Sequence, residues 1–138
     1  MKTFDELKKF IEIKAAAFQA VDEGECYENV WECDVIQSQV ANEVIIFAAA
    51  DGLILKTVDL SLYINNISKT VDDFDNETAW EEWSNEWFEQ ADDYEWQIEM
   101  EMLALADKQE LPAQTQLIYE FWQSTFWPDS VLDKSNGI

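Results

Sequence analysis

Apolar side chains recur every three or four residues through most of the chain, the spacing that places them on one face of an α-helix. Thr3 and Thr78 each precede a glutamate by three residues, which is the capping-box signature of a helix start, while Gly52 and Pro128 mark helix ends. The pattern predicts helices over residues 4–22, 34–51, 60–74, 78–106 and 112–127. We therefore expect a mainly α protein: a compact bundle of four to five helices that forms a single acidic domain over residues 1–138, with a frayed tail at 129–138.

A second interpretation stays open for residues 44–64. In it, Val44–Phe47 and Leu53–Leu55 are strands joined across Asp51–Gly52, a dipeptide favoured in hairpins. The fold would then be α+β, with a small antiparallel hairpin around 44–64. The run Ala48–Ala50 favours the helix, because alanine has the highest helix propensity.

The connections are predicted to be acidic and short. Residues 24–33 link the first two predicted helices, and the acidic residues 72–76, which overlap the end of the apolar spacing at Phe74, link the third to the fourth. Two cysteines, Cys26 and Cys33, are too few for a disulfide framework, and the N-terminus lacks an apolar signal core. No stretch approaches the length of an apolar membrane span, so we expect a cytoplasmic protein with free thiols and no membrane association.

The charge balance limits the partners that the chain can have. It contains 30 Asp and Glu against 8 Lys, no Arg and no His, for a formal charge of −22. Direct binding to nucleic acid depends on Lys and Arg at phosphates, and anionic membranes repel such a chain as well. The expected partner is therefore a basic protein surface.

Residues 78–102 combine four tryptophans with nine carboxylates and no base. Wound on a helix, the large apolar residues fall near one line, which we predict to be a core stripe: Trp80, Trp83, Trp87, Ala91, Tyr94, Ile98, Met102 and Leu105. The acids fall elsewhere. One row runs opposite the tryptophans, and Glu81, Asp92 and Glu99 form a neighbouring row.

Exposure to solvent explains why one face of the predicted helix is polar, but it does not explain why all the charges on that face are negative. Between Lys69 and Lys108 the chain has 14 acids and no base, although like charges four residues apart cost about 0.2–0.5 kcal/mol per pair. Ten of these acids lie in the 25 residues Glu77–Glu101, which is one per about 3.7 Å of helix axis. Phosphates follow one another at about 3.4 Å along a DNA strand. The segment therefore presents carboxylates at a phosphate-like density.

In its size, net charge and acidic helix at Glu77–Glu101, the sequence resembles the small acidic DNA-mimic proteins of phages and plasmids. That resemblance implies an inhibitor of host defence, anti-CRISPR or anti-restriction, which occupies the nucleic-acid-binding surface of a basic target in the host cytoplasm. The predicted target-binding acids are those before and along this helix: Asp72, Asp73, Asp75, Glu77, Glu81, Glu82, Glu86, Glu89, Asp92 and Asp93.

Trp96 and Met100 form a second apolar strip on the side where the acids of the first half of the helix lie. Burial of this strip, by the helix that starts at Pro112, is the favoured interpretation. The alternative is an interface in which Trp96 and Met100 anchor a target or a second copy of the chain in a homodimer.

The sequence offers no catalytic residues, no cofactor motif and no metal site. Without histidine there is no His-based triad and no zinc-protease motif, and no Gly-rich phosphate loop occurs. Asp73, Asp75 and Glu77 begin like a calcium loop, but Thr78 and Ser84 replace the required Gly and Glu. We therefore expect a non-enzymatic protein. The rival interpretations are an immunity protein or antitoxin that neutralises a basic nuclease toxin, and halophilic adaptation, which seven Trp and eight Phe fit poorly.

Overall fold

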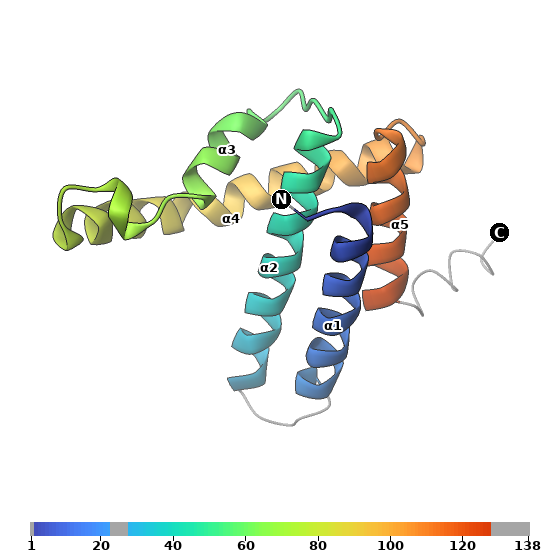
Figure 1. Ribbon diagram of the computed structural model, residues 1–138, viewed down its shortest axis with the longest axis horizontal. Helices are drawn as coiled ribbons and strands as arrows, with labels where there is room; N and C mark the ends of the chain where they lie inside the picture. Colours follow the sequence, from blue (N-terminus) through green and yellow to red (C-terminus); the bar gives the residue numbers. More distant parts are fainter. Residues whose placement is uncertain (1, 23–27, 128–138) are drawn as a thin grey trace. The chain divides into compact units, whose positions relative to one another are not determined.

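The computed structural model describes residues 2–22 and 28–127, with the side chains of residues 22 and 28–31 left out (Figure 1). The elements are α1 (Phe4–Asp22), α2 (Glu28–Ala50), α3 (Leu60–Ile67), a 3-10 turn η1 (Val71–Asp73), α4 (Glu77–Asp107) and α5 (Ala113–Phe126). No strand occurs in the described residues. The prediction of a mainly α protein with four to five helices is confirmed, and the hairpin alternative for 44–64 is wrong.

The helices belong to two compact units, and the single-domain expectation stays a prediction. One unit combines α1 and α2 with α5, and the other runs from Leu53 to Leu111 and contains α3, η1 and α4. In the first unit α1 packs against both α2 and α5, and the three helices run side by side (Figure 1). Its core consists of side chains from all three helices that are almost fully enclosed: Leu7, Ile11, Val40, Val44, Ile45, Ile118 and Trp122.

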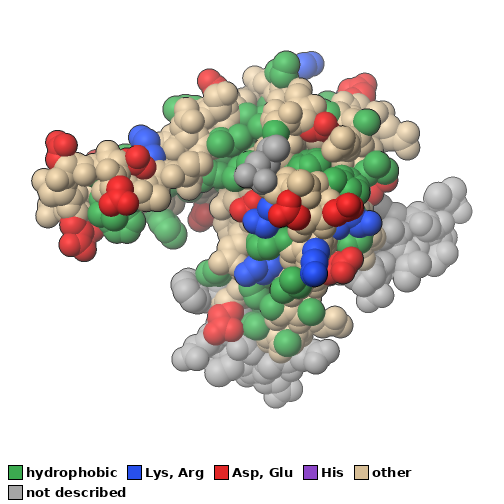
Figure 2. All heavy atoms as spheres, viewed as in Figure 1, with side chains coloured by type: hydrophobic (Ala, Val, Ile, Leu, Met, Phe, Trp, Pro, Cys, Tyr) green, Lys and Arg blue, Asp and Glu red, His purple; other side chains and the backbone are tan. Residues whose placement is uncertain are grey.

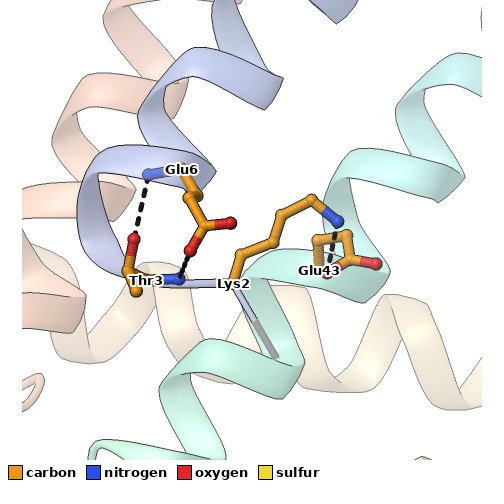
Figure 3. Close-up of polar contacts among 4 residues, drawn as sticks. All are labelled: Lys2, Thr3, Glu6 and Glu43. Atoms are coloured by element: carbon orange, nitrogen blue, oxygen red, sulfur yellow. Dashed lines mark hydrogen bonds and ion pairs between the residues drawn. The ribbon is translucent and has the colours of Figure 1, made fainter.

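The start of α1 follows the sequence signal. Glu6 N donates to Thr3 Oγ1, and Thr3 N donates to Glu6 Oε1, both at 3.2 Å (Figure 3). These hydrogen bonds lower the pKa of Glu6, with the one from the Thr3 backbone contributing most. Lys2 reaches Glu43 of α2 at 3.4 Å, as the same figure shows. The predicted capping box is confirmed.

The start of α2 differs from the prediction. The helix begins at Glu28, so Asp34 lies inside it instead of capping it, and the predicted connection at 24–33 is largely helical after residue 27. The sequence did not predict the first turns of α2, because apolar residues recur at regular helical spacing only after Asp34. Its end is confirmed: α2 stops at Ala50, and Gly52 takes a φ of 102°, which suits glycine. Cys26 and the tail at 129–138 lie outside the described residues.

The start of α5 depends on a carboxylate from a distant part of the chain. Pro112 stands at the N-cap position and makes no side-chain cap hydrogen bond. Asp51, just after α2, accepts hydrogen bonds at 2.9 Å from both the backbone N and the Oγ1 of Thr115. Thr115 is completely buried, so this one carboxylate satisfies both donors and joins the end of α2 to the start of α5.

In the second unit α3 is shorter than predicted. Asp59 caps its start by accepting from Leu62 N at 3.2 Å, and the helix ends at Ile67 instead of residue 74. Asn66 donates its side-chain amide to Leu62 O, and Ser68 follows as the C-cap. Asn and Ser compete for backbone groups in this way, which explains the early end. Residues Val71–Asp73 then form η1.

The helix α4 has 31 residues and begins one residue before the predicted cap. Asn76 Oδ1 accepts from Ala79 N at 2.8 Å, so Asn76 is the N-cap and the predicted capping box of Thr78 with Glu81 is wrong. Asn is a better N-cap than Thr, which explains why the helix begins after Asn76 and not after Thr78. After α4, Gln109 takes a φ of 57°, a left-handed conformation that is common just beyond a helix end.

We expect Asp51→Ala to lower the free energy of unfolding by about 1–3 kcal/mol, because it leaves two donors of buried Thr115 without an acceptor. The matched control is Asp34→Ala. Asp34 lies on α2 in the same unit, but it is exposed and its side chain makes no hydrogen bond to a described residue. Chemical denaturation of both variants measures the difference. Equal stability of the two variants would show that the carboxylate does not hold α5.

Candidate functional site

The apolar side of α4 is a stack of aromatic rings in its first half and a closed core in its second. Trp87 lies between Trp83 and Tyr94, with ring centroids at 6.2 and 5.7 Å and nearly parallel planes. Tyr63 of α3 packs on Trp87 at 5.9 Å, and Phe74 packs on Trp83 at 5.3 Å. These contacts hold the α4 rings in fixed positions.

The predicted core stripe is confirmed in its second half alone. Ile98 and Met102 are completely buried, whereas Trp80, Trp83 and Trp87 are half-buried. The reason is length: α3 has 8 residues, about 12 Å of helix, and α4 has 31, about 46 Å. Within this unit α3 is too short to enclose the first half of α4.

All ten predicted target-binding acids, from Asp72 to Asp93, are exposed to solvent. None of them makes an ion pair with another described residue. Asp73 has a local task, since its Oδ2 accepts from Thr70 N at 2.8 Å. Figure 2 shows Asp and Glu side chains spread over the end of the second unit that carries η1 and the start of α4. The structure thus leaves these acids exposed in one part of the second unit, from η1 through the first half of α4, and their role in binding stays a prediction.

Lys69, the lysine nearest to these acids in sequence, contacts aromatic rings and makes no ion pair with the acids. Lys69 Nζ lies 5.2 Å from the ring centre of Trp83 and 5.9 Å from that of Phe74. An ammonium over an aromatic face gains about 0.5–1 kcal/mol at an exposed site, similar to a surface ion pair. The aromatic stack therefore holds the cation that would otherwise neutralise part of the acidic surface.

Three acids of Glu77–Glu101 are partly buried instead of exposed: Glu95, Glu99 and Glu101. The continuous exposed row is therefore Glu77–Asp93, which carries seven acids over about 25 Å of axis. That is still one acid per about 3.6 Å. The sequence did not predict the partial burial of these three acids, because helical spacing alone does not show where another segment covers the helix.

Glu101 fixes the segment before α3. Its two carboxylate oxygens accept from Lys56 N at 2.6 Å, Thr57 N at 3.0 Å and Thr57 Oγ1 at 2.5 Å. Burial of the carboxylate raises its pKa, but these hydrogen bonds outweigh burial and the net pKa is lowered. This is a structural contact, and nothing in the sequence around residue 101 signals it.

Glu99 lies in the opposite situation, beside Tyr63 of α3. Burial raises the pKa of Glu99, because no donor compensates the loss of water strongly enough to reverse the shift. The Tyr63 hydroxyl also has a raised pKa, first from burial and then from the charges of Glu95, Glu99 and Asp92. Ionised Glu99 therefore destabilises the folded unit.

The predicted burial of Trp96 and Met100 is wrong. Trp96 is 64% exposed and Met100 is 46% exposed. Phe88, which sequence reasoning did not single out, is 77% exposed among the acids. The only signal for Phe88 was its position outside the aromatic line of α4. Three large apolar side chains on the acidic helix are thus open to solvent.

The described part of the chain contains no group of three or more His, Cys, Asp or Glu side chains arranged to hold a metal ion. None of its helices combines the length and apolar composition needed to cross a bilayer. No model of a protein family, no curated protein and no solved structure matches the chain.

Glu99 and Glu101, two residues apart, should respond oppositely to neutralisation at pH 7. We expect Glu101→Gln to lower the free energy of unfolding by about 1–2 kcal/mol, because it weakens three hydrogen bonds to a charged acceptor. We expect Glu99→Gln to raise the melting temperature, because it removes a buried charge.

The pH dependence follows from the two pKa shifts. A lowered folded-state pKa means that Glu101 stabilises the fold above its ordinary value of 4.5, and that this contribution disappears as the pH falls through the folded-state pKa. Ionised Glu99 has the opposite effect on stability, so the free energy that it costs the fold disappears as the pH falls below 4.5. Thermal melting from neutral to acidic pH measures both. Parallel curves for the two variants would contradict the assignment.

Proposed function

We propose that the protein is a non-enzymatic mimic of nucleic acid, which binds the DNA- or RNA-binding surface of a basic protein and blocks it. The observation that carries this proposal is the set of ten carboxylates from Asp72 to Asp93, all exposed and none in an ion pair with a described residue. A basic partner can supply every missing counter-charge. The mechanism is competition, because the carboxylates occupy the sites that phosphates would fill.

Two properties of α4 support this mechanism. The row Glu77–Asp93 has one acid per about 3.6 Å, close to the phosphate spacing of about 3.4 Å along one strand. The row also stands on a continuous helix whose aromatic side is locked by the Trp83–Trp87–Tyr94 stack. A rigid array loses little conformational entropy when it binds, so more of the electrostatic attraction remains as affinity.

The specific form of the proposal is an anti-CRISPR or anti-restriction inhibitor of a phage or mobile element, acting in the host cytoplasm. It is supported by the resemblance in size, charge and acidic helix to DNA-mimic inhibitors. An immunity protein that neutralises a basic nuclease toxin is the second candidate. Exposed Trp96 and Met100 favour it, because an apolar anchor suits recognition of one compact patch.

Competition with DNA tests the proposal directly. The immobilised full chain is used to capture partners from a bacterial lysate, and each partner is purified and tested for DNA or RNA binding with and without the chain. The chain and the nucleic acid should exclude each other. A partner that binds both at once would contradict the mimic mechanism. As a control, the chain alone should not shift labelled duplex DNA in the absence of metal.

Neutralising the acidic row should reduce inhibition without unfolding the protein. We expect the fourfold change of Glu81, Glu82, Glu86 and Glu89 to Gln to weaken target binding by about ten-fold, since exposed charges each contribute modestly. Its melting temperature should not fall, because like-charge repulsion is reduced. Inhibition and thermal melting are measured together.

The matched control changes four exposed acids of the first unit, Asp5, Glu12, Glu32 and Asp34, to their amides. Both variants lose four negative charges, so only the position of the charges differs. Equal loss of inhibition would show that net charge alone drives binding. Full activity of the α4 variant would exclude this face as the mimic.

Salt should act in opposite directions on binding and on folding. Raising salt from about 50 to about 500 mM screens exposed charges, so affinity for the target should fall while the melting temperature of the free chain rises. Binding isotherms and melting curves over that range measure the two effects. An affinity independent of salt would favour the apolar interface at Trp96 instead.

A further inference from the structure

A small hollow lies on the surface of α4 beside the acidic row. It measures about 240 Å³ and is lined by Gln90, Asp93, Tyr94 and Gln97. Asp93 and Tyr94 are adjacent, and each is three or four residues from both Gln90 and Gln97, so the four residues share one side of the helix. Tyr94 is held by its stack on Trp87, at 5.7 Å and 21° between planes. The Tyr94 ring therefore forms one side of the hollow in a fixed position.

The size and the chemistry of the hollow limit what it can receive. Pockets for drug-sized ligands begin at about 300 Å³, so this hollow suits a single side chain. Asp93 gives the lining its only charge, and Glu86 and Glu89 lie one turn before Gln90 and Asp93 on the helix. No lysine occurs on α4 itself. This charge distribution favours an occupant with a positive charge. A metal ion is disfavoured because the lining offers one carboxylate alone.

Among cationic side chains, arginine fits this lining better than lysine. Its planar guanidinium stacks on an aromatic ring and donates two parallel hydrogen bonds to a carboxylate. Asp93 supplies the carboxylate, Tyr94 the ring, and the side-chain carbonyls of Gln90 and Gln97 accept remaining N–H groups. Lysine is a compact, strongly hydrated charge that uses less of this geometry.

We propose that this hollow receives an arginine side chain of the basic partner and that exposed Trp96 and Met100 form the apolar edge of the same contact. Trp96 follows Asp93 by three residues and Met100 follows Gln97 by three, so each lies about one turn of α4 from a residue that lines the hollow. The inference rests on the proposed function for the existence of a basic partner. It adds that α4 selects guanidinium over ammonium.

Charge argues against a second copy of the chain as the occupant. The unit that contains α4 has sixteen Asp and Glu against three Lys, a formal charge of −13 over residues 53–111. A homodimer through Trp96 and Met100 would bring two such acidic surfaces together, and like charges across an interface cost affinity. The occupant is therefore a basic protein segment, and the dimer is an outcome that the test can detect.

The test uses the full chain and two short peptides, one alternating arginine with alanine and the other alternating lysine with alanine. Both carry the same charge. Titration calorimetry at about 50 mM salt should give about five-fold tighter binding of the arginine peptide, from stacking on the ring. Asp93→Asn and Tyr94→Leu should reduce that ratio to about one, while Tyr94→Phe, which keeps the ring, should preserve it.

Glu82→Gln is the matched control. It removes one charge from the exposed face of α4 outside the hollow, so it should weaken both peptides equally and leave their ratio unchanged. Equal affinity of the two peptides for the unmodified chain would overturn the proposal, and so would a ratio that Asp93→Asn does not alter. Sedimentation should show a monomer. A dimer lost on Trp96→Ala would assign the surface to a second copy and overturn the proposal.

This experiment separates the inference from the proposed function. A chain that excludes DNA from its target but binds both peptides equally would refute arginine selection alone. A chain that prefers arginine yet binds its target together with DNA would refute the mimic mechanism alone.

Discussion

Mutual repulsion among its carboxylates is the physical constraint that the fold of the second unit has to overcome. Sixteen acids against three lysines oppose compaction of residues 53–111, so other interactions must hold the unit together. The structure meets this requirement along the length of α4. The aromatic stack stabilises its first half, buried Ile98 and Met102 stabilise its second, and Glu101 finds three donors for the charge that it brings inward. Glu99 is the residue at which this compensation is incomplete.

The lysines show how the acids remain unpaired. Among the described residues the ion pair is between Lys2 and Glu43, and Lys2 also has its ammonium over an aromatic ring. Lys8, Lys14 and Lys69 have an ammonium over a ring and no ion pair with a described residue. Aromatic faces attract these cations about as strongly as exposed carboxylates do. The aromatic content of 14% thus has two consequences: it builds the packing that opposes charge repulsion, and it engages Lys69, the lysine nearest in sequence to the predicted target-binding acids. Both leave the acidic surface open to an external partner.

Local signals predicted some helix ends correctly and missed others, such as the start of α4 at the Asn76 cap. The capping box of Thr3 and Glu6 and the glycine at position 52 gave correct helix ends, because each acts through its immediate neighbours. The start of α5 was close to prediction, but its cap comes from Asp51, 64 residues away, and no local pattern contains that partner. Helical spacing predicted which residues share a face of α4, and the exposure of the seven acids from Glu77 to Asp93 agrees with it. Spacing does not tell whether another segment covers a face, which is why Trp96 was expected to be buried and Glu101 to be exposed.

The two kinds of surface on α4 have different physical consequences for recognition. Exposed carboxylates act over roughly a Debye length, so they attract basic surfaces quickly but distinguish poorly between them. Desolvated aromatic and apolar contacts act only at contact, and they depend on the shape of one partner. On α4 the exposed carboxylates of Glu77–Asp93 are followed along the helix by the Tyr94 hollow, which Asp93 lines, and by exposed Trp96 and Met100. An acidic row alone would bind basic proteins in general. Its continuation into a hollow and an apolar edge gives the helix a means to retain one of them, because the contact that follows electrostatic attraction controls dissociation.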